Sequence, residues 1–437
     1  MKTLLRNFDI LTSVSSNPVE DGALLIEDGI IQEIITDNHH ESGISADRTV
    51  DGHGKLLSPG FLNAHTHLGM TLFRGYADDM ELDRWLQDWI WPAEENLTEE
   101  EVYWGSLLAL IESIRSGVTS LADMYFHMDQ TARAIEKSGI RGLISYGLIA
   151  DELDQEGQAE LDTALELAEE WDGGAGGRIR VALSPHAPYT CGDEVLREVA
   201  RIADRENLPI HTHISETKKE VDGSYEEFGC SPVERLKDLG IFANEVLAAH
   251  CVHLDETDME LLVDNDVTVA HNPSSNMKLA SGAAPIEELA NHGAKITLGT
   301  DGPGTNNDLD MFGEMRQASF LAKLESNDPT ALAAEETLNF ATGSEIDQFG
   351  LSTTGKIAEG NRADLIGLDR SSAHWIPEYR TVSNLVYSGK HSDVEMVMVD
   401  GNILMEDGKL ETIDEEKVKS KVQEIGKKYE KIRKNHK

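Results

Sequence analysis

Residues 56–67 read LLSPGFLNAHTH, an apolar run that ends in two histidines separated by a single threonine. In a β-strand, residues i and i+2 face the same side, so His65 and His67 would point in one direction and meet at one cation. The pair alone leaves two interpretations open, because two histidines on one strand face are often only hydrogen-bonded. The rest of the chain has to decide between them.

Further short apolar runs recur through the middle of the chain and alternate with longer segments of helical character. The runs rich in β-forming residues cover residues 143–149, 179–183, 210–214, 246–249, 267–270 and 296–298. Residues 160–171 and 193–206 are typical of helices. Repeated alternation of this kind predicts an α/β fold in which residues 58–357 form a (β/α)8 TIM barrel.

Three of the later runs also end in residues that can bind a metal or move a proton. Residues 211–216 read HTHISE and place His213 and Glu216 at the end of one run. His250 ends the next run, and Asp301 follows the run at 296–298. TIM barrels carry functional groups at the carboxyl-terminal mouth, where these side chains would meet. Four runs that end in His or Asp therefore favour a metal site.

Both ends of the chain read as short strands joined by tight turns. Two hairpins with Asp-Gly turns are predicted, at residues 23–26 with 30–35 and at residues 394–399 with 403–405. Further strands are expected at residues 355–357 and 363–366. We expect residues 1–57 and 358–437 to form one small composite β-sandwich domain.

Near the C-terminus, apolar residues spaced by three and four predict an amphipathic helix with lysines on its other face; they are Val418, Val422, Ile425, Tyr429 and Ile432. A basic helix of this kind can bind a membrane or a calmodulin-like partner. A surface helix packed on its own domain is the simpler interpretation, and we favour it.

The chain of 437 residues carries a formal charge of -42, from 80 acidic against 38 basic residues. Nucleic acids and anionic membrane surfaces would be repelled, so neither is expected as a partner. Such an acidic surface is typical of halophilic proteins in a salt-rich cytoplasm, where salt screens the repulsion between carboxylates. A polycationic partner is the alternative that we favour less.

Cysteine usage and hydropathy bear on the compartment. Cys191, Cys230 and Cys251 are too few and too irregularly spaced for a disulfide framework or a cysteine zinc site. No stretch approaches the roughly 18 apolar residues of a membrane span, and the first residues lack the apolar core of a signal peptide. We therefore expect a cytoplasmic protein.

Several longer segments carry a family resemblance. They are PGFLNAHTHLGMTLFRGYADDMELDRWLQDWIWPAEE from residue 59, LSPHAPYTCG from 183, HTHISET from 211, AAHCVHL from 248, HNPSSNMKLASG from 271, GTDGPGTNNDLDMF from 299 and GKIAEGNRADLI from 355. Together they resemble the amidohydrolase superfamily, most closely its 5′-methylthioadenosine/S-adenosylhomocysteine deaminase family, which includes 5′-deoxyadenosine deaminase-like members. The resemblance covers nearly the whole chain and implies a metal-dependent aminohydrolase of nucleoside metabolism and purine salvage.

Carried over residue by residue, the resemblance implies a metal held by His65, His67, His213 and Asp301. Imidazole and carboxylate ligands suit Zn²⁺ in an open catalytic site, with Fe²⁺ and Mn²⁺ as alternatives. Relatives with two metals bridge them with a carboxylated lysine or a glutamate at the end of the fourth strand. Here that region reads SPH at residues 184–186, so one ion per subunit is expected.

The same resemblance implies catalytic roles for Asp301, Glu216 and His250. Asp301 would take a proton from the attacking water, and Glu216 would donate one to N1 of a purine. His250 would steady the attacking hydroxyl or the tetrahedral centre. The simpler interpretations, a surface carboxylate for Glu216 and a backbone-bonded buried histidine for His250, are less favoured.

Substrate binding is expected from Glu216 and Asp301 together with Glu94 and His186. Glu94 resembles the family's acceptor of the ribose hydroxyls, and His186 resembles its substrate-contacting histidine. One of three nearby tryptophans would cover the purine or the 5′ group, although an aromatic cluster more often belongs to the core; they are Trp85, Trp89 and Trp91.

One departure from the family concerns the 5′ end of the substrate. Family members that accept S-adenosylhomocysteine bind its carboxylate with arginines, but this chain has Tyr146 at one such position and no Lys or Arg in residues 147–177. Arg141 or Arg178 reaching in from elsewhere is the alternative. We expect deamination of 5′-deoxyadenosine or 5′-methylthioadenosine, with adenosine and S-adenosylhomocysteine as further candidates.

Two rival functions stay open. One is an amidohydrolase that acts on guanine, cytosine or a triazine; the other is a barrel scaffold that has lost its metal and its catalysis. Glu94 favours a ribose-bearing substrate over a free base, and the complete set of candidate ligands argues against a scaffold. Besides the small-molecule substrate, the expected partners are further copies of the chain, because relatives often form dimers or tetramers.

Overall fold

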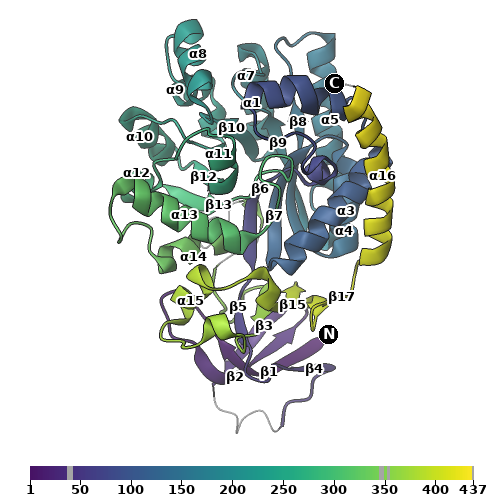
Figure 1. The fold of residues 1–437 in the computed structure, drawn as a ribbon, viewed down its shortest axis with the longest axis vertical. Helices are drawn as coiled ribbons and strands as arrows, with labels where there is room; N and C mark the ends of the chain where they lie inside the picture. The colour runs from purple at the N-terminus through teal and green to yellow at the C-terminus, as the bar shows by residue number, and fades with distance from the viewer. Residues whose placement is uncertain (37–42, 344–348, 352–354, 436–437) are drawn as a thin grey trace.

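The protein, as a computed structural model, is described over residues 1–36, 43–343, 349–351 and 355–435. Its centre is a sheet of eight parallel strands in sequence order, whose first and last strands come into contact (Figure 1). These strands are β6 (Phe61–Thr66), β7 (Val118–Tyr125), β8 (Arg141–Leu148), β9 (Ile179–Pro185), β10 (Ile210–Ile214), β11 (Val246–His250), β12 (Thr268–His271) and β13 (Lys295–Leu298). The predicted eight-stranded α/β barrel is confirmed.

Helices follow the strands and cover the outside of the barrel (Figure 1). The longer ones are α3 (Glu99–Arg115), α4 (Met128–Ser138), α5 (Gln155–Trp171), α7 (Asp193–Glu206), α8 (Lys218–Phe228), α10 (Glu256–Asp264), α13 (Met311–Ser326) and α14 (Ala334–Thr342). The shorter ones are η2 (Leu68–Phe73), α1 (Leu82–Trp85), η3 (Leu86–Ile90), α2 (Trp91–Glu94), α6 (Gly174–Gly177), α9 (Pro232–Asp238), η4 (Ile241–Ala243), α11 (Pro273–Lys278), α12 (Ile286–Asn291), η6 (Ala373–Trp375), α15 (Thr381–Tyr387) and η7 (His391–Asp393).

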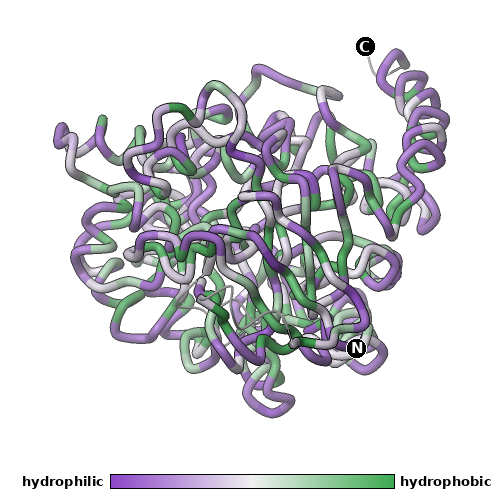
Figure 2. The backbone as a smooth tube through the Cα atoms, turned by 90° about the horizontal axis from the view of Figure 1, so that it is seen from below, coloured by the Kyte–Doolittle hydropathy of each residue, from purple (hydrophilic) through white to green (hydrophobic). Residues whose placement is uncertain are grey.

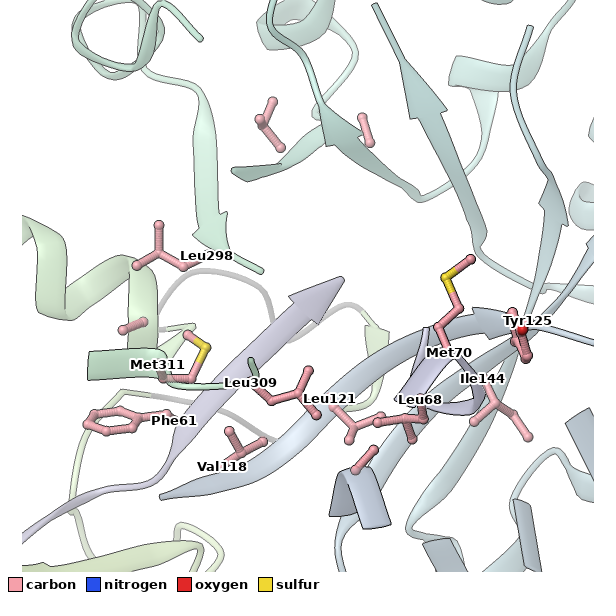
Figure 3. Close-up of a cluster of buried hydrophobic side chains, with 14 of the residues drawn as sticks. Phe61, Leu68, Met70, Val118, Leu121, Tyr125, Ile144, Leu298, Leu309 and Met311 are labelled. Atoms are coloured by element: carbon pink, nitrogen blue, oxygen red, sulfur yellow. The ribbon is translucent and has the colours of Figure 1, made fainter. Parts of the chain in front are cut away.

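The barrel strands are buried on both faces, as the continuous apolar runs of the sequence require. Inside the barrel, small and medium side chains from six strands pack with Phe349 and Leu351. Outside, a larger cluster joins the strands to the segments around them; Figure 3 shows part of it, including Phe61, Leu121 and Met311. The inner packing closes the barrel interior, so that a site can form only at an end.

The predicted strand ranges agree with the barrel to within a few residues, but residues 355–357 form no strand. The backbone N–H of Ile357 donates to Thr12 instead of to a strand ladder. The predicted strand at 363–366 begins only at Leu365, as β14 (Leu365–Leu368), because the N–H of Ala363 donates to the Gly29 turn.

A second sheet of nine strands combines both ends of the chain. The N-terminal part supplies β1 (Lys2–Ile10), β2 (Val19–Glu27), β3 (Ile30–Ile35), β4 (Arg48–Asp51) and β5 (Leu56–Pro59); the C-terminal part supplies β14, β15 (Val394–Val399), β16 (Asn402–Glu406) and β17 (Lys409–Leu410). The two parts join where β5 pairs antiparallel with β14. Leu5, Phe8 and Met398 belong to a hydrophobic cluster of this sheet alone, so the separate β domain from both ends is confirmed.

Two contacts fix the β domain to the barrel. Strand β5 runs into β6 through Gly60, where a Cβ atom would lie only 2.2 Å from the Thr119 side chain. The guanidinium of Arg141, at the start of β8, lies 3.1 Å from Asp364 and 2.8 Å from Asp400 of the β domain. The Arg141 side chain is therefore held in ion pairs with the β domain at the start of its strand, away from the barrel mouth.

Helix α16 (Glu415–Asn435) packs on α3 of the barrel, at the edge of the molecule in Figure 2. Val418 and Tyr429 are buried there, and the Tyr429 hydroxyl donates to Glu101 over 3.1 Å. Lys428 forms a 2.7 Å ion pair with the same carboxylate. The apolar face of the helix is thus covered by the chain itself, but by the barrel and not by the β domain to which the prediction assigns it, so that part of the prediction is wrong. No helix in the described ranges is long and apolar enough to cross a membrane.

Candidate active site

Three histidines converge at the mouth of the barrel. His65 lies near the end of β6, His67 directly follows that strand, and His213 lies near the end of β10. Their potential ligand nitrogens lie within 4.8 Å of one another. The i, i+2 spacing of the first two therefore brings both rings to one point, as the sequence predicts.

Hydrogen bonds to the backbone fix two of these rings. The Nδ1–H of His67 donates to the carbonyl oxygen of Met124, and the Nδ1–H of His213 donates to that of His186 over 2.6 Å. A neutral imidazole that donates from Nδ1 keeps a lone pair on Nε2. In both rings this lone pair is the one left to bind a metal.

Asp301 completes the group from the loop that follows β13. Its backbone N–H donates to the carbonyl of His65 over 2.9 Å, and its φ of 61° turns the chain sharply after the strand. The carboxylate accepts hydrogen bonds from the Ser275 hydroxyl and the Gly302 N–H, both over 2.6 Å. Asp301 Oδ1 lies 3.2 Å from His67 Nε2 and 3.6 Å from His65 Nε2.

The side chains fit a divalent metal ion. His65 Nε2 is buried and has no hydrogen-bond partner within the described residues, although a buried polar atom ordinarily has one. The Asp301 carboxylate, which also faces His67, lies 3.6 Å from this atom. Three imidazole nitrogens and one carboxylate, without a thiolate, are a donor set that could hold such an ion.

Glu216 lies beside this group, two residues after β10. One carboxylate oxygen accepts a hydrogen bond from the Ser281 hydroxyl over 3.3 Å, and the other lies 3.7 Å from His250 Nε2. Burial raises the pKa of Glu216 above its ordinary value. A carboxyl group with a raised pKa keeps its proton more readily and can act as a general acid.

A neighbouring carboxylate holds the backbone of this turn. Glu220 accepts hydrogen bonds from the N–H groups of Ser215 and Glu216 over 2.9 and 2.8 Å. Ser215 has a φ of 51°, a left-handed conformation that is costly for a residue with a side chain. The two bonds to Glu220 support that conformation and so orient Glu216.

His250 ends β11 and is buried, with a φ of 74°. Its Nδ1–H donates to the side-chain oxygen of Asn276 over 2.8 Å. This bond leaves Nε2 to face Glu216 and the space before the histidines. The side-chain contact differs from the backbone-bonded histidine considered as the simpler interpretation.

Glu94 and His186 line a cavity at the barrel mouth together with His67, Glu216 and Asp301, and we call it the catalytic cavity. The Tyr125 hydroxyl donates to Glu94 over 2.6 Å, and burial raises the pKa of Glu94 to about 7 despite this bond. His186 Nδ1 lies 3.0 Å from the Thr190 hydroxyl, and burial lowers the pKa of His186 to about 4. His186 is therefore a neutral ring near pH 7.

The catalytic cavity is covered by residues 82–94. Leu82, Leu86 and Trp91 line it from this side, together with Trp85, whose indole N–H donates to the Ala77 carbonyl over 3.0 Å. Trp89 does not line it and packs on Tyr76 instead. Two of the three tryptophans singled out in the sequence thus face the cavity, and the third belongs to the packing around it.

A second cavity adjoins the first and shares Trp91, Glu94, Phe126 and Ile149 with it. Tyr146 lines the second cavity, and its hydroxyl lies 3.2 Å from both carboxylate oxygens of Glu160. The other carboxylates of its wall are Glu95, Asp129, Glu166 and Glu170. Over the described part of the chain, no lysine or arginine lines this cavity, so neither Arg141 nor Arg178 reaches it.

Some contributors to the site were not singled out in the sequence. They are Tyr125, Glu220, Ser275, Asn276 and Ser281. Tyr125 ends β7, so the strand-end signal that pointed to the histidines applies to it as well. The others lie in helices or loops and act through hydrogen bonds, for which the sequence carries no periodic signal.

Comparison with known proteins agrees with this architecture. The sequence profile of the amidohydrolase family matches residues 56–404. The chain is 44% identical over 431 residues to a 5-methylthioadenosine/S-adenosylhomocysteine deaminase of Syntrophomonas wolfei, covering 98% of this chain and 99% of that one. It is 47% identical over 400 residues to a 5'-deoxyadenosine deaminase of Methanothermobacter thermautotrophicus, covering 92% and 93%.

Among solved structures, an adenosine deaminase from Xanthomonas campestris with bound zinc matches with a TM-score of 0.92. The two are 33% identical, and the match covers 98% of each chain. The resemblance read from the sequence motifs is confirmed by these relatives. This chain belongs to the amidohydrolase family and is a hydrolytic deaminase.

Proposed function

We propose that the protein catalyses the zinc-dependent hydrolytic deamination of adenosine-type nucleosides, forming the inosine analogue and ammonia. The observation that carries the proposal is the convergence of three histidines and Asp301 beside a buried Glu216 at the barrel mouth. The names of relatives at 44% and 47% identity support the adenosine-type substrate.

The ion would be held by His65, His67, His213 and Asp301, one ion per subunit. Zn²⁺ suits this donor set, with Fe²⁺ and Mn²⁺ as the alternatives. When bound, such an ion acts as a Lewis acid that acidifies a water molecule near neutral pH. Zinc in the Xanthomonas campestris deaminase supports this choice.

The chain's own residues would move the protons. Asp301 takes a proton from the attacking water while Glu216 gives its proton to N1, so that C6 becomes tetrahedral. Asp301 then gives the proton to the departing amine, and the new C6 hydroxyl returns one to Glu216. The reaction consumes one water and releases one ammonia. His250 Nε2, held by Asn276, would hydrogen-bond the oxygen on C6.

The rest of the nucleoside would extend from the catalytic cavity into the second one. Glu94 accepts the ribose hydroxyls at the shared wall, where its ionised form is the better acceptor. His186 contacts the substrate, and Trp85 or Trp91 covers the purine. Because carboxylates line the second cavity and no lysine or arginine does so over the described part of the chain, we propose a small uncharged 5′ group, as in 5′-deoxyadenosine or 5′-methylthioadenosine.

We further propose a cytoplasmic homo-oligomer, dimer or tetramer, built from a barrel at residues 58–357 and a β domain at residues 1–57 and 358–437. The three unpaired cysteines suit a reducing compartment.

The test is ammonia release from purified protein with a panel of substrates, at low and at molar KCl. The panel contains 5′-deoxyadenosine, 5′-methylthioadenosine, adenosine, S-adenosylhomocysteine, guanine, cytosine and a triazine. We expect activity on the adenosine nucleosides that disappears with a strong chelator and returns with Zn²⁺. Activity on a free base alone, or full activity without any transition metal, would overturn the proposal.

A further inference from the structure

His211 is a fully buried histidine on β10, two residues before His213, and its ring faces His65. The two rings stand at 90° with centroids 5.1 Å apart, and His211 Nε2 lies 2.9 Å from His65 Nδ1. At this distance one of the two nitrogens carries a hydrogen and donates it to the other.

This contact differs from those of the other two histidines in the cluster. His67 and His213 donate from Nδ1 to main-chain carbonyls, which can only accept a hydrogen bond. An imidazole can either accept or donate, so the contact between His65 and His211 allows two arrangements of the hydrogens. The tautomer of His65 therefore depends on a side chain, not on the backbone.

Only one of the two arrangements leaves a ligand for a metal. If His65 donates from Nδ1 to His211 Nε2, its own Nε2 keeps a lone pair beside Asp301. If His211 donates instead, the hydrogen of a neutral His65 is on Nε2, 3.6 Å from the Asp301 carboxylate, and no lone pair is left there. The first arrangement alone explains the buried Nε2 atom as a metal ligand.

We propose that His211 is a positioning residue that accepts the Nδ1–H of His65 and so holds His65 Nε2 ready to bind the metal ion. The inference rests on the metal site of the proposed function. A partner of this kind typically contributes tenfold to a hundredfold to metal affinity. A neutral His211 that accepts at Nε2 carries its hydrogen on Nδ1, an atom buried without a partner among the described residues.

Four variants test this role through the dissociation constant for Zn²⁺, measured by competition with a chromophoric chelator on the whole protein. His211→Leu removes the acceptor, and His211→Asn keeps a polar group that is too short to reach His65. His211→Gln places an amide oxygen near the position of Nε2 and can accept. His271→Leu is the matched control, because His271 is also a buried histidine of a barrel strand, and no ring contact joins it to the cluster among the described residues.

We expect Zn²⁺ binding about 10- to 100-fold weaker in the Leu and Asn variants, rescue by Gln, and no change in the control. The visible absorption of the Co²⁺-loaded protein should change in the Leu and Asn variants and not in the Gln variant. If His211→Leu does not fold, the Gln and Asn pair decides the question alone.

Wild-type affinity in the Asn variant, or a Gln variant as weak as the Asn variant, would overturn the positioning role while leaving the metal site intact. A wild-type protein that binds no Zn²⁺ would overturn the metal site of the proposed function and this inference with it. The deamination rate is not the readout, so the two failures are distinguishable.

Discussion

Glu216 is the residue whose proposed role is most easily separated from metal binding. It touches Ser281 and faces His250, and it is held by backbone bonds to Glu220, so its removal leaves the ligand set in place. Glu216→Gln should lower kcat by about two or more orders of magnitude, because the substitution removes the proton donor. The zinc content should stay unchanged, because no metal ligand is removed. Glu169→Gln, an exposed change on α5, is the control for rate and metal analysis. Loss of zinc from the Glu216 variant would contradict this role.

The raised pKa of Glu94 leads us to expect that substrate binding depends on pH. Burial raises its pKa to about 7, so the acid form predominates below that pH and the carboxylate above it. Ribose hydroxyls donate better to the carboxylate, so kcat/KM for nucleosides should rise as the pH increases through about 7.

The hydrogen bond from Tyr125 favours the charged form of Glu94, and Tyr125→Phe should therefore move this midpoint to higher pH. Profiles of kcat/KM against pH for the two proteins measure the shift. Tyr103→Phe, a change on α3, is the control. A midpoint that stays in place in the Tyr125 variant would mean that another group titrates.

Tyr146 and Glu160 predict discrimination at the 5′ end of the substrate. The Tyr146 hydroxyl donates to Glu160 and cannot bind a substrate carboxylate as an arginine would. The other carboxylates that line the second cavity repel the carboxylate of S-adenosylhomocysteine. Loss of a charge-assisted contact costs about 1.5–3 kcal/mol. We expect kcat/KM for 5′-methylthioadenosine to exceed that for S-adenosylhomocysteine by at least about tenfold.

Glu160→Gln and Tyr146→Arg should each narrow that ratio, whereas Glu169→Gln on the outside of the same helix should not. Specificity constants for both substrates in the four proteins measure it. Equal constants in the wild-type protein would show that a cation reaches the 5′ group by another route, such as a neighbouring subunit.

Among the residues of the site, those that follow a local spacing pattern could be predicted from the sequence. Those that reach the site only through tertiary contacts could not. His65 and His67 are visible because a strand places every second residue on one face. Tyr125 meets Glu94 only because residues 82–94 fold over the mouth, and Asn276 meets His250 only because α11 follows β12 in this orientation. Spacing along the chain does not encode such contacts.

Among the elements, strand β8 carries both a cavity residue and the link to the β domain. Arg141 begins the strand as the buried partner of Asp364 and Asp400, and Tyr146 lies near its other end. Arg141→Gln would remove the cation that faces the buried Asp364, whereas Asp400 keeps its 2.7 Å pair with Arg362, and should destabilise the fold by about 3–5 kcal/mol.

A thermal melt of the Arg141→Gln variant measures this loss. Arg380→Gln removes an arginine that is 69% exposed in its pair with Glu335 and should leave the melting temperature near that of the wild type. If both variants melt at the same temperature, the buried cluster does not hold the two parts of the chain together.

Periodicity predicted the regular elements well and their surroundings less well. Residues 210–214 and 193–206 match β10 and α7, because one is a continuous buried run and the other has a clear apolar stripe. The strand expected at 355–357 is absent because its backbone bonds to another turn. Helix α16 was predicted as a helix, but its place on α3 depends on Tyr429 and Lys428 meeting Glu101.

For the molecule as a whole, the charge of -42 predicts a stability that depends on salt. Even if every lysine and arginine paired with a different carboxylate, 42 carboxylates would stay unmatched, and in the folded state they lie closer together than in the unfolded chain. Salt at about 1 M shortens the screening length to about 3 Å, which removes most of the repulsion between exposed charges. The melting temperature should therefore rise with KCl from low concentration to the molar range. Sucrose, which also favours compact states but screens no charge, is the control.

An equal rise of the melting temperature in sucrose would assign the effect to solvent exclusion. A melting temperature that does not change with KCl would show that the acidic surface is no adaptation to salt.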